Sequence, residues 1–226
     1  MKKFILFFSL LFTINAFAQQ QPTPLVSVIG EGTVTVVPDQ VLMNSRVEHQ
    51  GNSAAEVKSQ NDKVVNEILK FLKSQGIPAK NIQTEYIRLN KEYNYNSKEY
   101  YYSANQAISV KLDDLGKYEE VMNGLLESGL NRIDGIEFKS SKKEQLESEA
   151  RKKAVLDAQA KAKELVAPLD QRLGGAFNIS EMETNHYQPL YRGMVEMKTA
   201  DSGAAQTIAP GEMEITVKVN VSFILL

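Results

Sequence analysis

Two glycines in a run of strand-forming residues set the first constraint on the fold of this chain. In the segment VSVIGEGTVTVV (residues 26–37), Gly30 and Gly32 alternate with β-branched and charged residues. A phosphate-binding loop needs its glycines between a strand and the first turn of a helix, where backbone N–H groups meet the anion. Here more strand follows the glycines, and the chain has no G-x-G-x-x-G or G-K-[ST] motif. The pair therefore predicts a bulge or a close backbone approach within a strand.

The first 18 residues have the pattern of a cleaved secretory signal. Lys2 and Lys3 precede an apolar run that ends at Ile14, and the small residues of AFAQQ follow. A helix that crosses a membrane takes about 20 apolar residues, so this run favours a signal peptide over a retained anchor. We expect an exported chain with a disordered tail over residues 19–24 and no transmembrane segment after residue 18.

Composition excludes several classes of function. The chain has no cysteine, which argues against a disulfide scaffold and against thiolate chemistry. Its 26 basic and 28 acidic residues give a net charge of −2, and removal of the signal makes the chain slightly more acidic. Such a surface has no electrostatic footprint for nucleic acid.

Hydrophobic periodicity predicts an α+β fold with a mostly antiparallel sheet. Strand patterns cover residues 25–37 and 40–50, and a capping box at Ser53 and Glu56 begins a helix that ends at Gly76. Residues 81–112 read as two long strands around a polar tip, and a second helix runs from Asp113 or Asp114 to Gly129 before a strand over 132–140. These elements form two successive strand–helix–strand units.

A long Ala-rich helix follows. Ser141 and Glu144 form a second capping box, and alanines recur every fourth residue at 150, 154, 158 and 162. A ridge of methyl groups lets a helix lie close to a sheet or to another helix. Pro168 should loosen the last turn. A strand over 176–184, a mobile loop over 185–210 and a strongly alternating final strand follow. The final strand should be an inner member of its sheet. Together these elements predict one domain over residues 25–226, with two intertwined subdomains.

Residues suited to catalysis or metal binding are scattered. His49 lies at a strand end and His186 in the predicted loop, and no spacing motif completes a metal site. There is no G-x-S-x-G motif, and Ser53, Ser141 and the Asp113–Asp114 pair are explained as helix caps. We therefore predict that the protein is not an enzyme and needs neither a cofactor nor a metal.

Tyrosines are concentrated in the predicted hairpin. Six of the nine tyrosines lie there, at positions 86, 93, 95, 100, 101 and 102. Two interpretations are open: cross-strand aromatic pairing that stiffens the hairpin, or a contact surface for a partner. The candidate interaction surface comprises Tyr93, Tyr95, Tyr100, Tyr101 and Tyr102.

Five segments, in order, resemble the SIMPL-domain family (DUF541). They are VIGEGTVTVVPDQV, GIPAKNIQTEY, YYYSANQAISVKLDD, the Ala-rich RKKAVLDAQAKAKELVAPL with LGG, and IAPGEMEITVKVNVSFIL. The resemblance implies an α+β fold and an exported bacterial protein of the periplasm or outer-membrane fraction, and family members are associated with envelope and oxidative-stress tolerance. Some assemble into oligomers, and no catalytic residues carry over. Tyr101 stands where the family often has glycine.

The leading hypothesis is a non-enzymatic exported protein that acts through self-assembly or binding, with the hairpin and strand edges as contact surfaces. Its partners would be copies of itself, an envelope protein or a peptide. The alternative is a small-molecule or peptide-binding module, with a pocket between the subdomains under the loop at 185–210. A third hypothesis, an unrecognised hydrolase, predicts a cleft with perturbed carboxylates.

Overall fold

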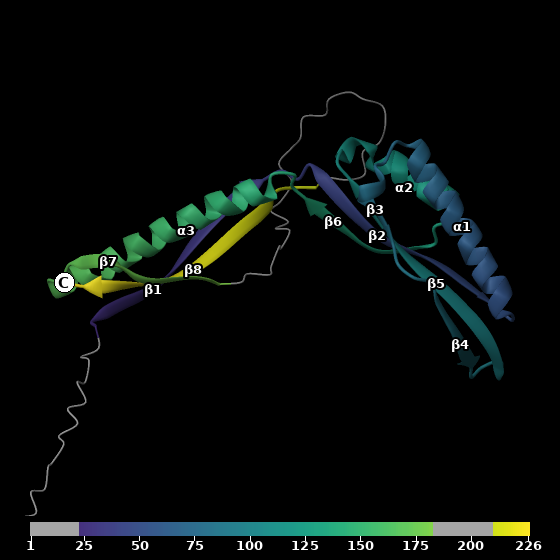
Figure 1. Cartoon of the computed structure of the whole chain (residues 1–226), viewed down its shortest axis with the longest axis horizontal. Helices are drawn as coiled ribbons and strands as arrows, with labels where there is room; N and C mark the ends of the chain where they lie inside the picture. The colour runs from purple at the N-terminus through teal and green to yellow at the C-terminus, as the bar shows by residue number, and fades with distance from the viewer. Residues whose placement is uncertain (1–22, 183–209) are drawn as a thin grey trace, which may run out of the picture.

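A computed structural model describes residues 23–182 and 210–226, and the fold is stated for those residues. The predicted signal peptide, most of the predicted tail and nearly all of the predicted loop at 185–210 lie outside them. The described chain forms two antiparallel sheets, set end to end in an elongated molecule (Figure 1). Each sheet carries helix on one face and has its own hydrophobic core, so the predicted α+β class is confirmed.

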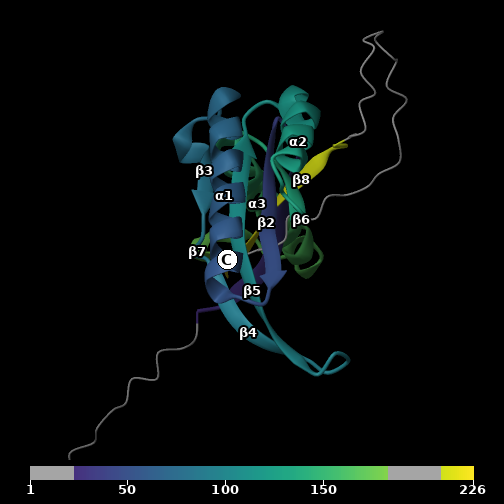
Figure 2. The ribbon, with the colours of Figure 1, turned by 90° about the vertical axis from the view of Figure 1, so that its right-hand side faces the viewer.

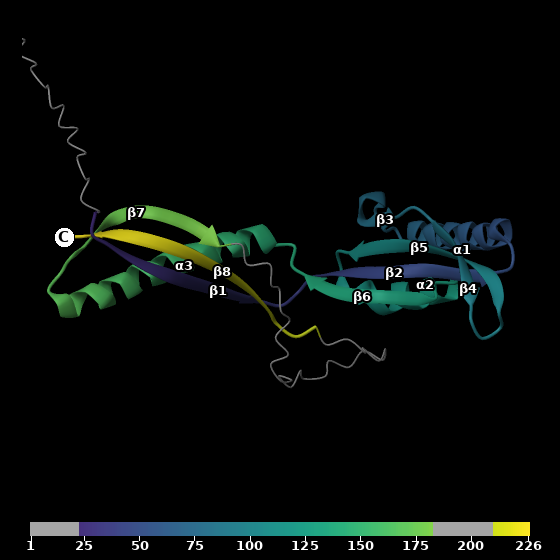
Figure 3. The same cartoon turned by 90° about the horizontal axis from the view of Figure 1, so that it is seen from below.

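The three-stranded sheet joins both ends of the described chain. Its order is β1 (Leu25–Val36), β8 (Met213–Leu225) and β7 (Leu173–Met182), so the final strand is the central one, as predicted. Helix α3 (Lys143–Val166) lies along one face of this sheet (Figure 3). Alternation along β8 buries Val217, Val219 and Val221 against the alanines of α3 and leaves the intervening polar residues on the other face.

The middle of the chain forms the five-stranded sheet. Strands β2 (Gln40–Gly51), β3 (Ile82–Thr84), β5 (Glu99–Leu112) and β6 (Arg132–Lys139) follow the order β3-β5-β2-β6, and β4 (Arg88–Asn94) also pairs with β5. Helices α1 (Ala54–Ser74) and α2 (Tyr118–Glu127) cover one face (Figure 2). The two predicted strand–helix–strand units, β2-α1-β3 and β5-α2-β6, both belong to this sheet.

The glycine pair of β1 marks a close backbone approach. A Cβ added at Gly30 would lie 2.6 Å from the backbone nitrogen of Ala158, and one added at Gly32 would lie 2.8 Å from the Cβ of Lys153. Four residues of helix rise about 6 Å, close to the span of two strand residues at about 6.6 Å. The alanine ridge of α3 therefore meets Gly32 and Gly30 in succession.

Polar side chains of α3 cover the outer edge of β1. The backbone N–H of Glu31 donates to Asp157 at 2.8 Å, while Lys153 and Lys161 donate to the carbonyls of Thr33 and Ile29 at 3.3 and 3.2 Å. These contacts satisfy backbone groups that an edge strand would otherwise expose. Asp157 and the two lysines thus protect β1 from pairing with another chain.

Most predicted helix ends are found, but neither predicted capping box forms. Gly76 has φ 72° and Ile77 N–H donates to Leu72 O at 3.1 Å, which is the expected Schellman end. The second capping box is wrong: α3 begins at Lys143, and Ser141 donates both its N–H and its hydroxyl to Asp39. A carboxylate 102 positions away is a stronger acceptor than the local alternatives, and no sequence window around Ser141 contains it.

Three further end signals can be compared with the structure. Ser53 occupies the N-cap position of α1, but its side chain makes no cap hydrogen bond, so the predicted capping box at Ser53 and Glu56 is also wrong, although the start of the helix is confirmed. Asp114 caps the 3₁₀ turn before α2 by accepting from Gly116 N–H at 2.8 Å, whereas Asp113 instead accepts from Gln40 and Asn81, each at 2.7 Å. The α-helical part of α3 ends before Pro168, which lies in a 3₁₀ turn, Ala167–Leu169.

Asp39 and Ser141 also mark the junction of the two sheets. The chain passes between the sheets at residues 37–39 and again at 140–142. The Asp39 carboxylate accepts from Ser141, and Asp39 N–H donates to Lys139 O at 3.1 Å. The two crossings are therefore tied to each other.

Candidate functional site

The predicted tyrosine cluster lies on a two-stranded ribbon. Strand β4 pairs with the first half of β5, with Tyr93 opposite Tyr100 and Lys91 opposite Tyr102. This ribbon, residues 88–105, extends past the end of the sheet that the helices cover (Figure 2). Four of the five predicted surface residues are on its strands, and Tyr95 begins the connecting turn.

Three tyrosines of the ribbon form an aromatic cluster. The rings of Tyr93 and Tyr100 are 4.9 Å apart between centroids, and Tyr95 meets Tyr93 edge-on at 5.2 Å. The ammonium of Lys91 lies 4.5 Å from the centroid of Tyr100 and 5.9 Å from that of Tyr102. Cross-strand pairing is thus present, yet Tyr95 keeps 84% and Tyr100 keeps 61% of its surface exposed. The same residues that stiffen the ribbon remain available for contact.

Tyr101 lies on the opposite face of the ribbon. Its hydroxyl donates to Glu92 on the paired strand, and Ser103 donates to the same carboxylate at 2.6 Å. The hydrogen bonds from Ser103 and Tyr101 lower the pKa of Glu92, and the bond to Glu92 raises the pKa of Tyr101. The candidate surface is therefore divided: Tyr93, Tyr100 and Tyr102 share one face, and Tyr101 belongs to a polar cluster on the other.

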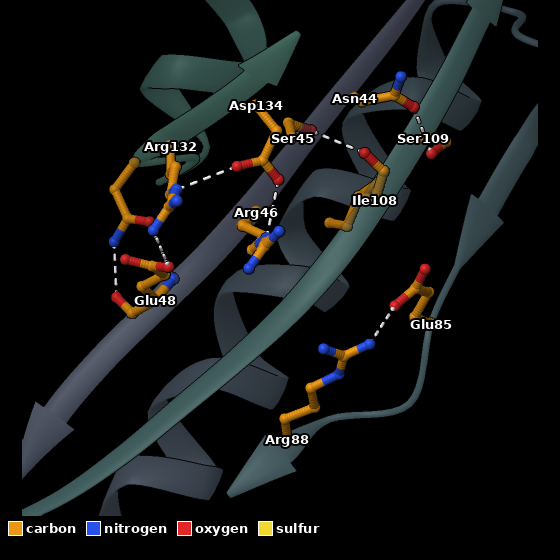
Figure 4. A network of polar contacts seen from close by, with 11 residues as sticks. Asn44, Ser45, Arg46, Glu48, Glu85, Arg88, Ile108, Ser109, Arg132 and Asp134 are labelled. Atoms are coloured by element: carbon orange, nitrogen blue, oxygen red, sulfur yellow. Dashed lines mark hydrogen bonds and ion pairs between the residues drawn. The ribbon is translucent and has the colours of Figure 1, made fainter. Parts of the chain in front are cut away.

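A polar hollow of about 300 Å³ lies on the helix-free face of the five-stranded sheet. Residues from four strands and from the β3–β4 connection line it: Asn44, Ser45, Arg46, Glu85, Tyr86, Arg88, Asn105, Ala107, Ser109 and Asp134. Figure 4 shows the polar contacts around Asn44, Arg46, Glu85, Arg88 and Asp134. Sequence reasoning predicted a pocket between the subdomains instead. The loop expected to cover that pocket lies outside the described residues apart from Pro210, and the polar hollow belongs to one sheet.

Strand alternation and an irregular connection together shape the polar hollow. Asn44 and Arg46 alternate with buried residues of β2 and so face away from the helices, and Arg46 pairs with the small Ala107 of β5. Between β3 and β4, three residues (85–87) stand opposite two residues of β5 (106–107). Glu85 N–H still donates to Ala107 O at 3.0 Å, while Tyr86 is 95% exposed at the rim.

Ion pairs line both sides of the hollow. Asp134 lies between Arg46 at 2.7 Å and Arg132 at 3.0 Å, and Arg132 also contacts Glu48 at 2.8 Å (Figure 4). The charge of Glu48 is the largest cause of a raised pKa for Arg132. Across the hollow, Arg88 contacts Glu85 at 3.4 Å. Arg46 and Arg88 are therefore each paired with a carboxylate on the same side of the hollow.

Sequence reasoning did not identify these hollow residues. They come from separate segments that only the sheet brings together. The one local signal is the polar series Asn44, Arg46 and Glu48, which alternates with the apolar positions of β2.

The described part of the chain forms no metal site. Among residues 23–182 and 210–226, no group of three or more His, Cys, Asp or Glu side chains could hold a metal ion. His49 lies on β2 with a buried Nδ1 that has no hydrogen-bond partner in this part of the chain, and His186 lies outside the described residues. The described helices include none that is both long enough and apolar enough to span a membrane.

The family follows from a match along almost the whole described fold. The sequence model of the family described as "SIMPL: Protein of unknown function (DUF541)" matches residues 26–223. The chain belongs to the SIMPL (DUF541) family. The match runs from β1 to β8 and so includes both sheets, the ribbon and the hollow of this SIMPL protein.

Curated relatives agree with this assignment. The chain is 30% identical over 227 aligned positions to the 26 kDa periplasmic immunogenic protein of Brucella melitensis, with 94% of this chain and 90% of the relative covered. It is 27% identical over 206 positions to the protein YggE of Escherichia coli K12, with 88% and 82% covered. A YggE protein of Edwardsiella ictaluri is 28% identical over the same length, with 88% and 86% covered.

Proposed function

We propose that this SIMPL protein is a periplasmic, non-catalytic protein that associates with copies of itself through the tyrosine ribbon. The periplasmic location is supported by the Brucella relative, which is named as a periplasmic protein and is 30% identical across nearly the whole chain. The family resemblance adds a role in cell-envelope or oxidative-stress tolerance to this proposal. An envelope protein or a peptide that carries a matching apolar surface is a second type of partner.

The observation that carries the proposal is the exposed aromatic surface on the ribbon. Tyr95, Tyr100, Tyr93 and Leu89 are 84%, 61%, 38% and 40% exposed. Large, rigid aromatic side chains are enriched at the centres of protein interfaces, because they bury much area at a small cost in conformational entropy. These exposed side chains lie on a ribbon that extends past the end of the sheet covered by α1 and α2 (Figure 2).

Light scattering after size-exclusion chromatography tests this proposal. We expect the mature chain to form a concentration-dependent oligomer, and we expect the double variant Tyr95→Ser, Tyr100→Ser to shift it toward the monomer. Tyr86→Ser is the matched control, because Tyr86 is 95% exposed but lies outside the aromatic cluster. A wild-type chain that stays monomeric at high concentration, or an oligomer that the double variant leaves intact, would rule out the ribbon as the interface.

A further inference from the structure

We propose that the polar hollow binds a small zwitterion of the amino-acid or short-peptide class, with the ligand's carboxylate on the arginines and its ammonium on the acidic residues. Arg88 and Asn105 of the hollow form the first pair of the ribbon, but the proposed site contains none of the clustered tyrosines that carry self-association. Four observations support it: the balance of charges around the hollow, the donors that remain available on the arginines, the neutral polar groups between them, and the size of the space.

The charges around the hollow disfavour ligands whose charged groups all have the same sign. Arg46 and Arg88 supply two guanidinium groups, and Glu85 and Asp134 supply two carboxylates. A dianion would meet both carboxylates, and a dication would meet both guanidinium groups. A ligand that carries one charge of each sign can contact both kinds of group and avoid like-charge repulsion.

The arginines retain hydrogen-bond donors for a ligand. Arg46 contacts Asp134 through Nε, and its two terminal nitrogens have no protein acceptor among the described residues. Arg88 makes one long contact, 3.4 Å from Nη2 to Glu85, and its side chain is 67% exposed. A planar guanidinium with free terminal nitrogens can bind a carboxylate by two parallel hydrogen bonds.

Neutral polar groups lie between the charged sides. Ser109 donates to the side-chain oxygen of Asn44 at 2.8 Å, and the side chain of Asn105 has no hydrogen-bond partner in the described chain. An amide of this kind can pair with the N–H or C=O of a peptide bond. Ala107, opposite Arg46, is the smallest side chain that lines the hollow and leaves its floor open.

The space suits a small ligand. About 300 Å³ is at the lower end of the range for small-molecule sites, and Tyr86 at the rim can cover an apolar part of the ligand. This volume favours an amino acid or a dipeptide over a longer chain.

Titration by NMR with charge-matched probes tests the inference. The probes are glycylglycine and alanylalanine as zwitterions, succinate as a dianion and 1,4-diaminobutane as a dication. We expect saturable shifts of the amide signals of residues around the hollow with the dipeptides only. Arg46→Gln and Arg88→Gln should each weaken dipeptide binding about tenfold or more, because each removes a charge-assisted hydrogen bond.

Two further variants sharpen the test. Arg151→Gln removes an arginine with a similar carboxylate partner, Glu181, on the other sheet, so it should leave dipeptide binding unchanged. Glu85→Gln should weaken the dipeptides and strengthen succinate, since it removes a negative charge from the hollow. Binding of succinate by the wild-type protein as tightly as the dipeptides would overturn the zwitterion class, and dipeptide affinities weaker than about 10 mM would overturn the site.

Loss of affinity in the variants also needs a check of the fold. Circular dichroism and the midpoint of thermal unfolding should match the wild type in all four variants, because the replaced side chains lie on a polar, solvent-facing surface. Ribbon association is measured separately by light scattering, so each proposal can fail without the other.

Discussion

Gly30 and Ala158 bring the backbones of β1 and α3 into contact. A Cβ on Gly30 would lie 2.7 Å from the Cβ of Ala158, and the carbonyl oxygen of Ala154 is closer still. Real Cβ atoms do not approach other heavy atoms so closely, so only glycine fits at this position. Glycine is required at position 30 because a side chain has no room there. Its backbone conformation does not require glycine, since Gly30 is not among the glycines with positive φ.

Gly30→Ala should destabilise the three-stranded sheet strongly. The added methyl would meet helix backbone, which cannot rotate away, and α3 would have to move off the sheet. Overpacking of this kind costs about 3 kcal/mol in the free energy of unfolding. Urea denaturation followed by circular dichroism measures the loss. Gly135→Ala on β6 is the matched control, because a Cβ there meets nothing within 4 Å. Equal effects of the two substitutions would contradict the close-approach interpretation.

Asp157→Ala should weaken the cover on the edge of β1 in a pH-dependent way. The hydrogen bond from Lys161 and then that from Glu31 N–H lower the pKa of Asp157. A depressed pKa in the folded state means that the carboxylate stabilises the fold fully above its unfolded pKa of about 3.9. That contribution is lost as the pH falls through the lower, folded-state value.

Urea unfolding of wild type and Asp157→Ala across pH 2–7 measures this effect. The variant should be about 0.5–1 kcal/mol less stable near neutral pH, and the difference should shrink below about pH 4. Asp62→Ala removes an exposed i,i+4 pair with Lys58 and should cost less than about 0.5 kcal/mol. A difference for Asp157→Ala that grows toward low pH would have the wrong sign.

Asp39→Ala should loosen the junction between the sheets without unfolding either one. The substitution removes both hydrogen bonds from Ser141, while the two cores do not involve Asp39. Because the chain has no cysteine, spin labels can be placed at cysteines introduced only at Lys73 on α1 and Lys163 on α3. Pulsed electron paramagnetic resonance should show a broader distance distribution in the variant than in the wild type. Glu67→Ala on the surface of α1 is the control, and a distribution as narrow as the wild type's would show that other contacts hold the junction.

Local sequence patterns predicted the helices and strands better than they predicted the contacts between them. Alternation along residues 40–50 identified β2 and its buried face, and Gly76 with Ile77 identified the end of α1. The spacing of the alanines identified a helix with a narrow apolar ridge, and the glycines indicated a strand that another backbone approaches. Each inference depends on residues within about four positions of one another, where backbone geometry alone decides which side chains share a face.

The incorrect cap at Ser141 and the missed polar hollow share a physical cause. Ser141 has the sequence of a helix cap, yet it donates to Asp39, which is far away in the chain. The polar hollow needs β2, β4, β5 and β6 paired in one register, and no local composition marks the connection at 85–87 that interrupts its edge. Pairing between distant segments depends on which apolar faces pack together, and many pairings satisfy the same local pattern.

The sequence by itself determined the α+β class, most of the strands and helices, and the family of the protein. These features depend on backbone periodicity and on short-range hydrogen bonds, which neighbouring residues encode. The sequence missed the interruption at residues 85–87, which divides the first strand expected over 81–112 into β3 and β4. Only the tertiary structure decided that Gly30 and Gly32 meet the alanines of α3, that Glu92 is the partner of Tyr101, and that Arg46 and Arg88 border one hollow. Those contacts arise inside each separately packed unit, where strand pairing and the packing of helix on sheet bring together side chains from different elements, and no pattern within a single element specifies them.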